Sequence, residues 1–90
     1  MSKMIITVVG KDTIGIIAKV CTYLADNNMN ILDITQTIVQ GYFNMMMIVD
    51  VTQIEKSFET VGSELTALGQ GMGVQVKCQR EEIFDMMHRI

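Results

Sequence analysis

The stretch MIITVVGKDTIGI, residues 4–16, joins an apolar run to a polar turn and then to a repeat of apolar residues at helical spacing. Residues 4–9 are apolar on both alternating faces, which is typical of a strand in the centre of a sheet. After residue 13, apolar residues recur three and four positions apart: Ile14, Ile17, Ala18, Cys21, Leu24 and Ala25. The stretch therefore predicts a strand followed by a helix, with Asp12 or Thr13 as the helix N-cap.

The next segments predict a pair of strands joined by a tight turn. Asn27 and Asn28 should end the first helix, because Asn tolerates the left-handed geometry of helix exits. Residues 31–40 alternate apolar and polar side chains, a half-buried pattern that is expected near a sheet edge or beside a partner. Gln40-Gly41 predicts the turn. Residues 42–51, apolar on both faces, are the hairpin partner.

A second helix and a fourth strand complete the pattern. Thr52 and Glu55 fit a capping box at the start of an apolar stripe that runs to residue 72. Three glycines are expected to end this helix: Gly69, Gly71 and Gly73. Residues 74–79 alternate like a half-buried strand, and residues 81–90 predict a short helix with acids first and His88 and Arg89 last.

The resulting order, β-α-β-β-α-β, predicts an α+β fold. A compact arrangement for this order is the ferredoxin-like plait, a four-stranded antiparallel sheet with two helices on one face. The chain of 90 residues has room for one domain. We expect that domain over residues 1–80 and a short C-terminal helix over 81–90.

The charges and cysteines exclude several classes of protein. Seven basic against ten acidic residues give a net charge of −3, and no basic cluster is present for a nucleic acid. The two cysteines, Cys21 and Cys78, are too few for a disulfide scaffold and lack metal-ligand spacing. No apolar run is long enough to span a membrane, and no signal peptide pattern is present. We therefore expect a cytoplasmic protein with free thiols.

Catalytic chemistry finds little support in the sequence. His88 is the only histidine and lies next to the chain end, where a base is seldom held in position. Asp12, Asp33 and Asp50 are scattered and lack metal-ligand spacing. The run from Met45 to Met47 is better explained by packing in a sheet. We expect a protein that is not an enzyme and holds no cofactor and no metal.

The loop Gly10-Lys11-Asp12-Thr13-Ile14-Gly15-Ile16 is the best candidate for a binding site. A strand-to-helix junction presents backbone N–H groups and the positive end of a helix dipole, which suit a carboxylate or phosphate. Gly15 in the first helical turn costs up to ~1 kcal/mol relative to Ala. Either close packing on a neighbouring strand or the approach of a ligand would explain it, and the sequence does not choose between them.

With these residues in place, the chain resembles the ACT domain family, the small-molecule sensing modules of amino-acid metabolism. The resemblance covers residues 4–79 and rests on Gly10-Lys11-Asp12-x-x-Gly15-Ile16 and on Asn28-Met29-Asn30-Ile31. The whole length is similar to small stand-alone bacterial members, of the type of the glycine-cleavage repressor. One departure is Ile14, where many ligand-binding members have Pro.

The resemblance implies a homodimer that binds an amino acid between the first loop of one domain and the second strand of its neighbour. Asp12 would hold the ligand amine or a water, the backbone around Ile14, Gly15 and Ile16 would receive the carboxylate, and Asn30 would add hydrogen bonds. The implied ligand-binding set is Asp12, Thr13, Ile14, Gly15, Ile16, Asn30 and Ile31.

The composition points independently to an oligomer. Apolar residues make up 49% of the chain and charged residues only 19%, with a mean hydropathy of +0.31. Two helices cover one face of the sheet, so the apolar side chains on its other face need a cover. We expect a symmetric homodimer that buries them, with residues 81–90 covering a part.

The alternative function is an adaptor that regulates a protein partner by contact, without any small ligand.

Overall fold

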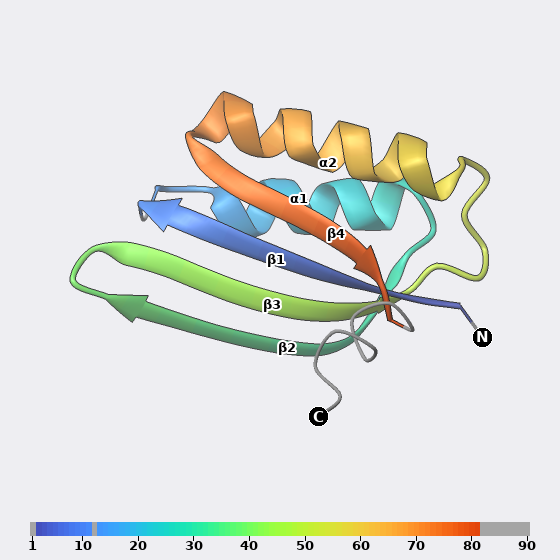
Figure 1. Cartoon of the computed structure of the whole chain (residues 1–90), viewed down its shortest axis with the longest axis horizontal. Coiled ribbons are helices and arrows are strands. Elements are labelled where there is room, and N and C mark those ends of the chain that lie inside the picture. The colour runs from blue at the N-terminus through green and yellow to red at the C-terminus, as the bar shows by residue number, and fades with distance from the viewer. Residues whose placement is uncertain (1, 12, 82–90) are drawn as a thin grey trace.

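The computed structural model describes residues 2–11 and 13–81. The elements follow the order β1 (Lys3–Lys11), α1 (Ile16–Asp26), β2 (Asn30–Val39), β3 (Tyr42–Asp50), α2 (Phe58–Met72) and β4 (Val74–Arg80) (Figure 1). The four strands form one sheet in the order β2-β3-β1-β4, and every neighbouring pair is antiparallel. This confirms the predicted ferredoxin-like plait. The expected terminal helix falls on residues 82–90, outside the described residues, apart from Glu81.

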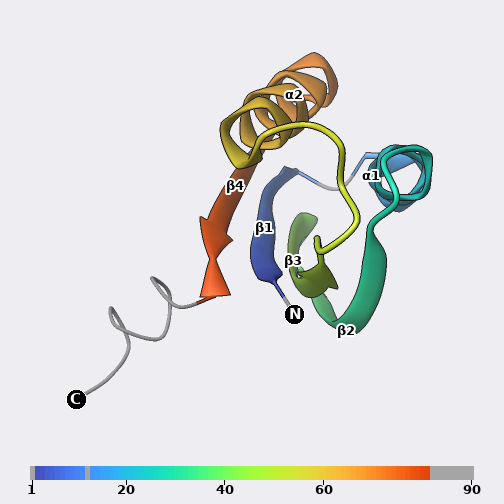
Figure 2. The ribbon, with the colours of Figure 1, turned by 90° about the vertical axis from the view of Figure 1, so that its right-hand side faces the viewer.

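The helices lie together on one side of the sheet, as Figure 2 shows from the end of the molecule. Alternation along β1 and β3 sends every second side chain into the layer between helices and sheet. The central position of β1 and β3 is the one that their apolar patterns predict. The buried core consists of Met4, Ile6, Val8, Ile16, Val20, Leu24, Met29, Phe43, Met45, Met47, Val49, Val51, Val61, Leu65, Val74 and Val76.

The methionine run of β3 behaves as a sheet interior. Met45 and Met47 are fully buried under the helices, whereas Met46 lies on the opposite face and is 39% exposed. Flexible thioether side chains fill irregular gaps between layers. The packing interpretation of this run is therefore confirmed.

The start of α1 differs from the prediction. Its N-cap is Gly15, in the left-handed region at φ 90°, and no side chain caps the helix. The hydroxyl of Thr13 donates instead to the carbonyl of Lys11, at 3.2 Å. Asp12 lies outside the described residues, and the prediction of an N-cap at Asp12 or Thr13 is wrong because the helix begins later, at Ile16.

The start of α2 also lies later than predicted. The N-cap is Ser57, whose side chain accepts a hydrogen bond from the N–H of Thr60 at 3.1 Å. Thr52 does not cap the helix, because both its N–H and its hydroxyl donate to the carboxylate of Asp50, at 2.9 and 2.6 Å. The capping box predicted at Thr52 is therefore wrong, and residues 52–57 form a connection.

The helix ends follow from residues that adopt left-handed backbone conformations. Asn28, two residues beyond α1, has a φ of 61°, as the Asn pair predicts. Gly73 is the C-cap of α2 with a φ of 76°. Gly69, by contrast, lies inside α2 and does not end it. Its role is close packing on β4, where a Cβ would lie 2.5 Å from Cγ2 of Val76.

A hydrogen-bonded cluster links α1 to α2 and to the connection before it. The Tyr23 hydroxyl donates to Oε1 of Glu64 at 2.6 Å, and the Lys56 ammonium donates to the same oxygen at 2.8 Å. The Lys56 ammonium also lies 5.8 Å from the centre of the Tyr23 ring. The hydrogen bond from Lys56, and to a smaller extent that from Tyr23, lowers the pKa of the Glu64 carboxyl. Burial, and to a smaller extent the hydrogen bond to Glu64, raises the pKa of the Tyr23 hydroxyl.

The cluster predicts that stability falls in acid. Because the pKa of Glu64 is lower in the folded than in the unfolded state, its contribution is present above the unfolded pKa, about 4.3, and is lost as pH falls below it. Glu64→Gln should therefore show a smaller loss of Tm than wild type between about pH 6 and about pH 3. Glu55→Gln, which changes the same charge at an exposed position outside the cluster, should behave like wild type. An equal loss of Tm in wild type and Glu64→Gln would contradict this.

Two glycines of α2 offer a matched test of its packing on β4. A Cβ at Gly69 would lie 2.9 Å from the carbonyl oxygen of Val74, so Gly69→Ala should cost roughly 1–3 kcal/mol of unfolding free energy. A Cβ at Gly62 would make an ordinary 3.9 Å contact with Cys78, so Gly62→Ala should gain about 0.5–1 kcal/mol from helix propensity. Urea denaturation measures both, and a stabilised Gly69→Ala would show that α2 does not pack this closely.

Candidate functional site

The first loop leaves the sheet at the end of β1 and delivers the chain to α1. Ile14 at its tip is 100% exposed. The N–H of Ile16 donates to the carbonyl of Thr13 at 3.4 Å, and the side chain of Ile16 is buried in the core. The loop is thus a short turn that presents a bare apolar side chain just before a helix N-terminus.

Backbone conformation, and not close packing, explains the glycine of this loop. A Cβ built on Gly15 would meet nothing within 4 Å, so no neighbouring strand requires its small size. Its φ of 90° is one that residues with a side chain rarely adopt. The packing alternative for Gly15 is therefore contradicted, and the space above it is open.

The start of α1 can receive an anion through its backbone. The N–H of Lys19 bonds to the carbonyl of Gly15 at 3.0 Å, which is the first bond of the helical ladder. The two preceding N–H groups, of Ile17 and Ala18, have no acceptor among the described residues. They lie at the positive end of the helix dipole, beside the open space at Gly15. This arrangement fits a carboxylate.

Asn30 and Ile31 lie at the other end of the sheet. Asn30 is exposed at the start of β2 and pairs with Asp50, which in turn pairs with Lys3. The Asp50 carboxylate is already occupied by Thr52, and those hydrogen bonds lower the pKa of Asp50. Ile31 is half-buried against the core.

A single chain therefore does not bring the expected site together. The loop follows Lys11, which pairs with Tyr42 at the turn end of the β2–β3 hairpin. Asn30 lies nine residues from that end of β2, at Val39, or about 30 Å at ~3.3 Å per residue. The loop and Asn30 of one chain lie at opposite ends of the sheet, which Figure 1 shows along the length of β2.

The strand β2 is much more exposed than its pattern predicts. Ile34 and Ile38 are on the helix side of the sheet, opposite Met47 and Phe43, yet they are 43% and 55% exposed. The hairpin projects past the start of α1 in Figure 1, and Val39 and Tyr42 beside its turn are 64% and 57% exposed, although Phe43 is buried. A shift of register between Ile31 and Asp33 also takes Leu32 out of the alternation. The expectation of a half-buried strand is thus wrong for the single chain, whereas its edge position is confirmed.

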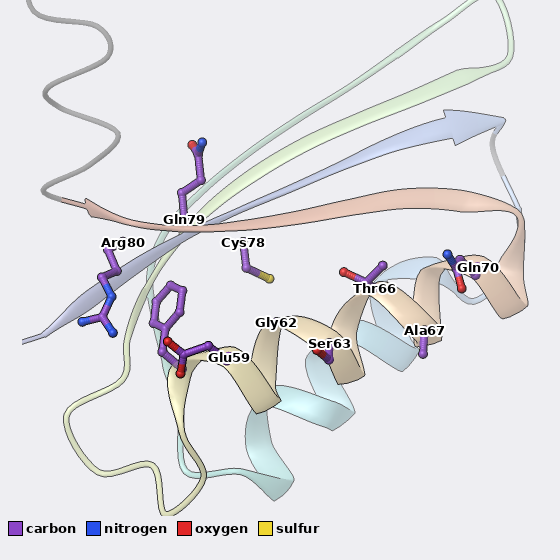
Figure 3. A pocket seen from close by; sticks show the side chains of 10 residues that line it. Glu59, Gly62, Ser63, Thr66, Ala67, Gln70, Cys78, Gln79 and Arg80 are labelled. Carbon is purple, nitrogen blue, oxygen red and sulfur yellow. The ribbon is translucent and has the colours of Figure 1, made fainter.

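A feature that the sequence pattern did not reveal lies at the opposite edge. Two open hollows, of about 720 and 780 Å³, run along β4 and the outer side of α2 and share Thr66, Gln70, Cys78 and Gln79. Figure 3 shows the first of them. The signal in the sequence was the run of small residues in α2, including Gly62, Ser63 and Ala67, which line it.

The described part of the chain contains no group of three side chains placed to hold a metal ion. Within the same residues, no helix has both the length and the apolar character needed to span a membrane.

Burial raises the pKa of the Cys78 thiol to about 11, so this thiol is protonated at neutral pH.

Comparison with known proteins identifies relatives that match this chain over its full length. A UPF0237 protein of Bifidobacterium longum is 61% identical over 90 residues, the full length of both chains. A UPF0237 protein of the archaeon Methanocaldococcus jannaschii is 47% identical, again over the full length of both, so similar proteins are not confined to bacteria.

Solved structures match over most of the chain. An ACT domain protein from Streptococcus pneumoniae has a TM-score of 0.81 at 40% identity, covering 93% of this chain and 94% of that one. A structure named for the glycine cleavage system transcriptional repressor has a TM-score of 0.72 and covers 88% of this chain and 45% of that one; at 24% identity it shows the fold alone. The ACT domain family matches residues 2–79. The chain therefore belongs to the ACT domain family.

Proposed function

We propose that this chain is a regulatory module that acts without catalysis, forms a homodimer through its β2 edges and binds an amino acid at that interface. The family supports the general role of a small-ligand-binding regulatory module. The observation that carries the proposal is the exposed β2 edge, with the first loop near one end and Asn30 at the other. We also retain the expectation of a reducing, cytoplasmic setting.

A two-fold symmetric dimer would bring the first loop of one chain close to Asn30 of the other. When two β2 strands pair in antiparallel fashion about a two-fold axis, each strand's start lies beside the other strand's end. Asn30 and Ile31 of one chain would then approach Val39 of its neighbour, at the end of the sheet where the first loop lies. The same pairing satisfies the unpaired backbone groups of both β2 edges.

The same surface exposes apolar side chains. Ile34 and Ile38 lie on the same face of β2 and are 43% and 55% exposed, an apolar surface that pairing of two chains would cover. The open face of the sheet also exposes Val9, Tyr42 and Met46, but the polar side chains of Thr7, Asn44 and Lys77 lie among them. We therefore place the dimer interface at β2 and not on the open face.

An amino acid has the chemistry that this site would bind. Its carboxylate suits the N–H groups of Ile17 and Ala18 at the positive end of α1. Its amine needs an acceptor, and the side-chain amide oxygen of Asn30 from the neighbouring chain offers one. By the family resemblance, Asp12 offers a second. The exposed Ile14 would lie against the ligand side chain.

The second candidate function is a protein-interaction adaptor that needs no small ligand. The fully exposed side chain of Ile14 favours it, because such a group binds an apolar surface whether or not a ligand is present. An adaptor would bind its partner with the same affinity in the presence and absence of every amino acid. A partner isolated with the protein distinguishes the two functions by this measurement.

Titration calorimetry with each of the twenty amino acids tests the ligand. We expect at least one to bind, and Asn30→Ala to weaken it by about 5- to 30-fold through the loss of one or two hydrogen bonds. Asn44→Ala is the matched control, since Asn44 is exposed on the open face of β3. No heat with any amino acid would contradict the ligand proposal, and an equal effect of both variants would contradict the site.

Sedimentation velocity tests the dimer and its surface. Ile38→Lys places a charge in the proposed β2 interface and should give monomers at micromolar concentration. Val9→Lys places the same charge at a site of similar exposure (47%) on the open face and should leave the dimer intact. Monomers formed by Val9→Lys alone would show that the open face is the interface.

A further inference from the structure

The edge of the sheet formed by β4 is free for a second, independent interaction. In the described residues β4 pairs with β1 alone, over seven continuous pairs from Met4–Arg80 to Gly10–Val74. The pairing contains no bulge, and the sequence contains no proline. Bulges and prolines are devices that proteins use to keep strands from adding to an edge. The β4 edge lacks both of them.

The backbone of this edge offers hydrogen bonds to an added strand. One side of an edge strand carries N–H and C=O groups that the sheet does not use. The Val76 carbonyl accepts a long hydrogen bond of 3.4 Å from the hydroxyl of Thr66. A hydroxyl can rotate away at little cost, so an incoming N–H would replace this contact with a shorter bond.

The hollow beside this edge has a volume of about 720 Å³ and is lined in part by small side chains. The first turns of α2 place Gly62, Ser63 and Ala67 along it, and these residues project little beyond the helix backbone. The Cys78 thiol forms its floor and is uncharged. Figure 3 shows the space between these residues and the strand. A strand added to β4 would direct alternate side chains into this space.

The end of the groove has one cation, Arg80, and the same hollow is lined by one acid, Glu59. The Arg80 guanidinium lies 4.6 Å from the centre of the Phe58 ring, and no carboxylate of the described residues forms an ion pair with it. Lys77 lines the neighbouring hollow but pairs with Thr7 and so belongs to the open face of the sheet, which leaves Arg80 as the cation on the side of α2. In a chain with a net charge of −3, this edge is therefore suited to an acidic partner.

We propose that β4 and α2 form a docking groove for an extended acidic peptide segment of a partner protein. The peptide adds as an antiparallel fifth strand beside β4, sets small or β-branched side chains over Gly62 and Ala67, and pairs an acidic side chain with Arg80. Backbone hydrogen bonds require an extended chain, so a helix would not satisfy this edge. The groove is separate from the β2 edge and does not depend on the amino-acid site.

A labelled peptide tests the groove on the full chain. The probe is a fluorescein-labelled peptide of alternating Thr and Val, with one Glu near its N-terminus, which antiparallel addition places beside Arg80. Fluorescence anisotropy should show binding, and a peptide with Lys in place of Glu should bind about fivefold more weakly. Two further versions carry N-methyl groups on the odd or on the even amides, and the version methylated on the amides that face β4 should not bind, because it lacks the donors that strand addition needs.

Charge reversal identifies the residue that selects the peptide. Arg80→Glu should reverse the preference, so that the Lys peptide binds more tightly than the Glu peptide. Lys19→Glu is the matched control, with the same charge change at an exposed site of α1, and should keep the original preference. In amide NMR spectra, the Glu peptide should shift Val76 and Cys78 of β4 and leave β2 unchanged.

Three results would overturn the proposal. One is the absence of binding by the Glu peptide at millimolar concentration. Another is binding that survives both patterns of N-methylation or shifts β2 in place of β4. The third is a change of oligomeric mass in Arg80→Glu without any peptide binding, because a second copy of the chain would then occupy this edge.

Discussion

An open four-stranded sheet has two edge strands, here β2 and β4. The groove and the proposed interface both depend on what lies beside each of these strands. Each edge carries backbone N–H and C=O groups that the sheet does not satisfy. The close packing of α2 on β4 at Gly69 fixes one edge beside a helix and so makes a groove. The β2 edge has no such helix beside its turn end, and its apolar side chains stay exposed there. The two edges therefore suit different partners.

The fold was predictable because its determinants are local and repeated. Alternation in residues 4–9 and 42–51, and helical spacing after Ile14 and Ile54, fix the type of each element. The helix starts were not predictable in the same way. Thr52 has the right neighbour for a capping box, but the Asp50 carboxylate two residues earlier competes for its N–H and hydroxyl. A sequence motif does not show which of two local hydrogen bonds is formed.

The residues of the candidate site were named from the sequence and the family resemblance, but their placement could not be derived from either. The sequence put Gly15 inside the first helical turn, whereas it is the N-cap of α1, and only its backbone φ and the empty space beside it distinguish conformation from packing. The separation of the loop from Asn30 follows from strand register, which depends on turn geometry and on the shift near Ile31. The groove beside β4 depends on a tertiary contact, so the small residues of α2 indicate it only once β4 is known to lie beside them.

The apolar excess of the chain now has a more definite location. The apolar content of 49% first suggests an uncovered apolar face of the sheet, but threonine, asparagine and lysine side chains interrupt that face. The exposed apolar side chains lie in two places: Ile14, Ile34 and Ile38 at the first loop and on the helix side of β2, and Val9, Tyr42 and Met46 on the open face. A surplus at an edge differs from a surplus on a face, because edge pairing adds backbone hydrogen bonds to apolar burial. Backbone pairing fixes the position of one chain relative to the other. A ligand site built from residues of two chains requires such a fixed position.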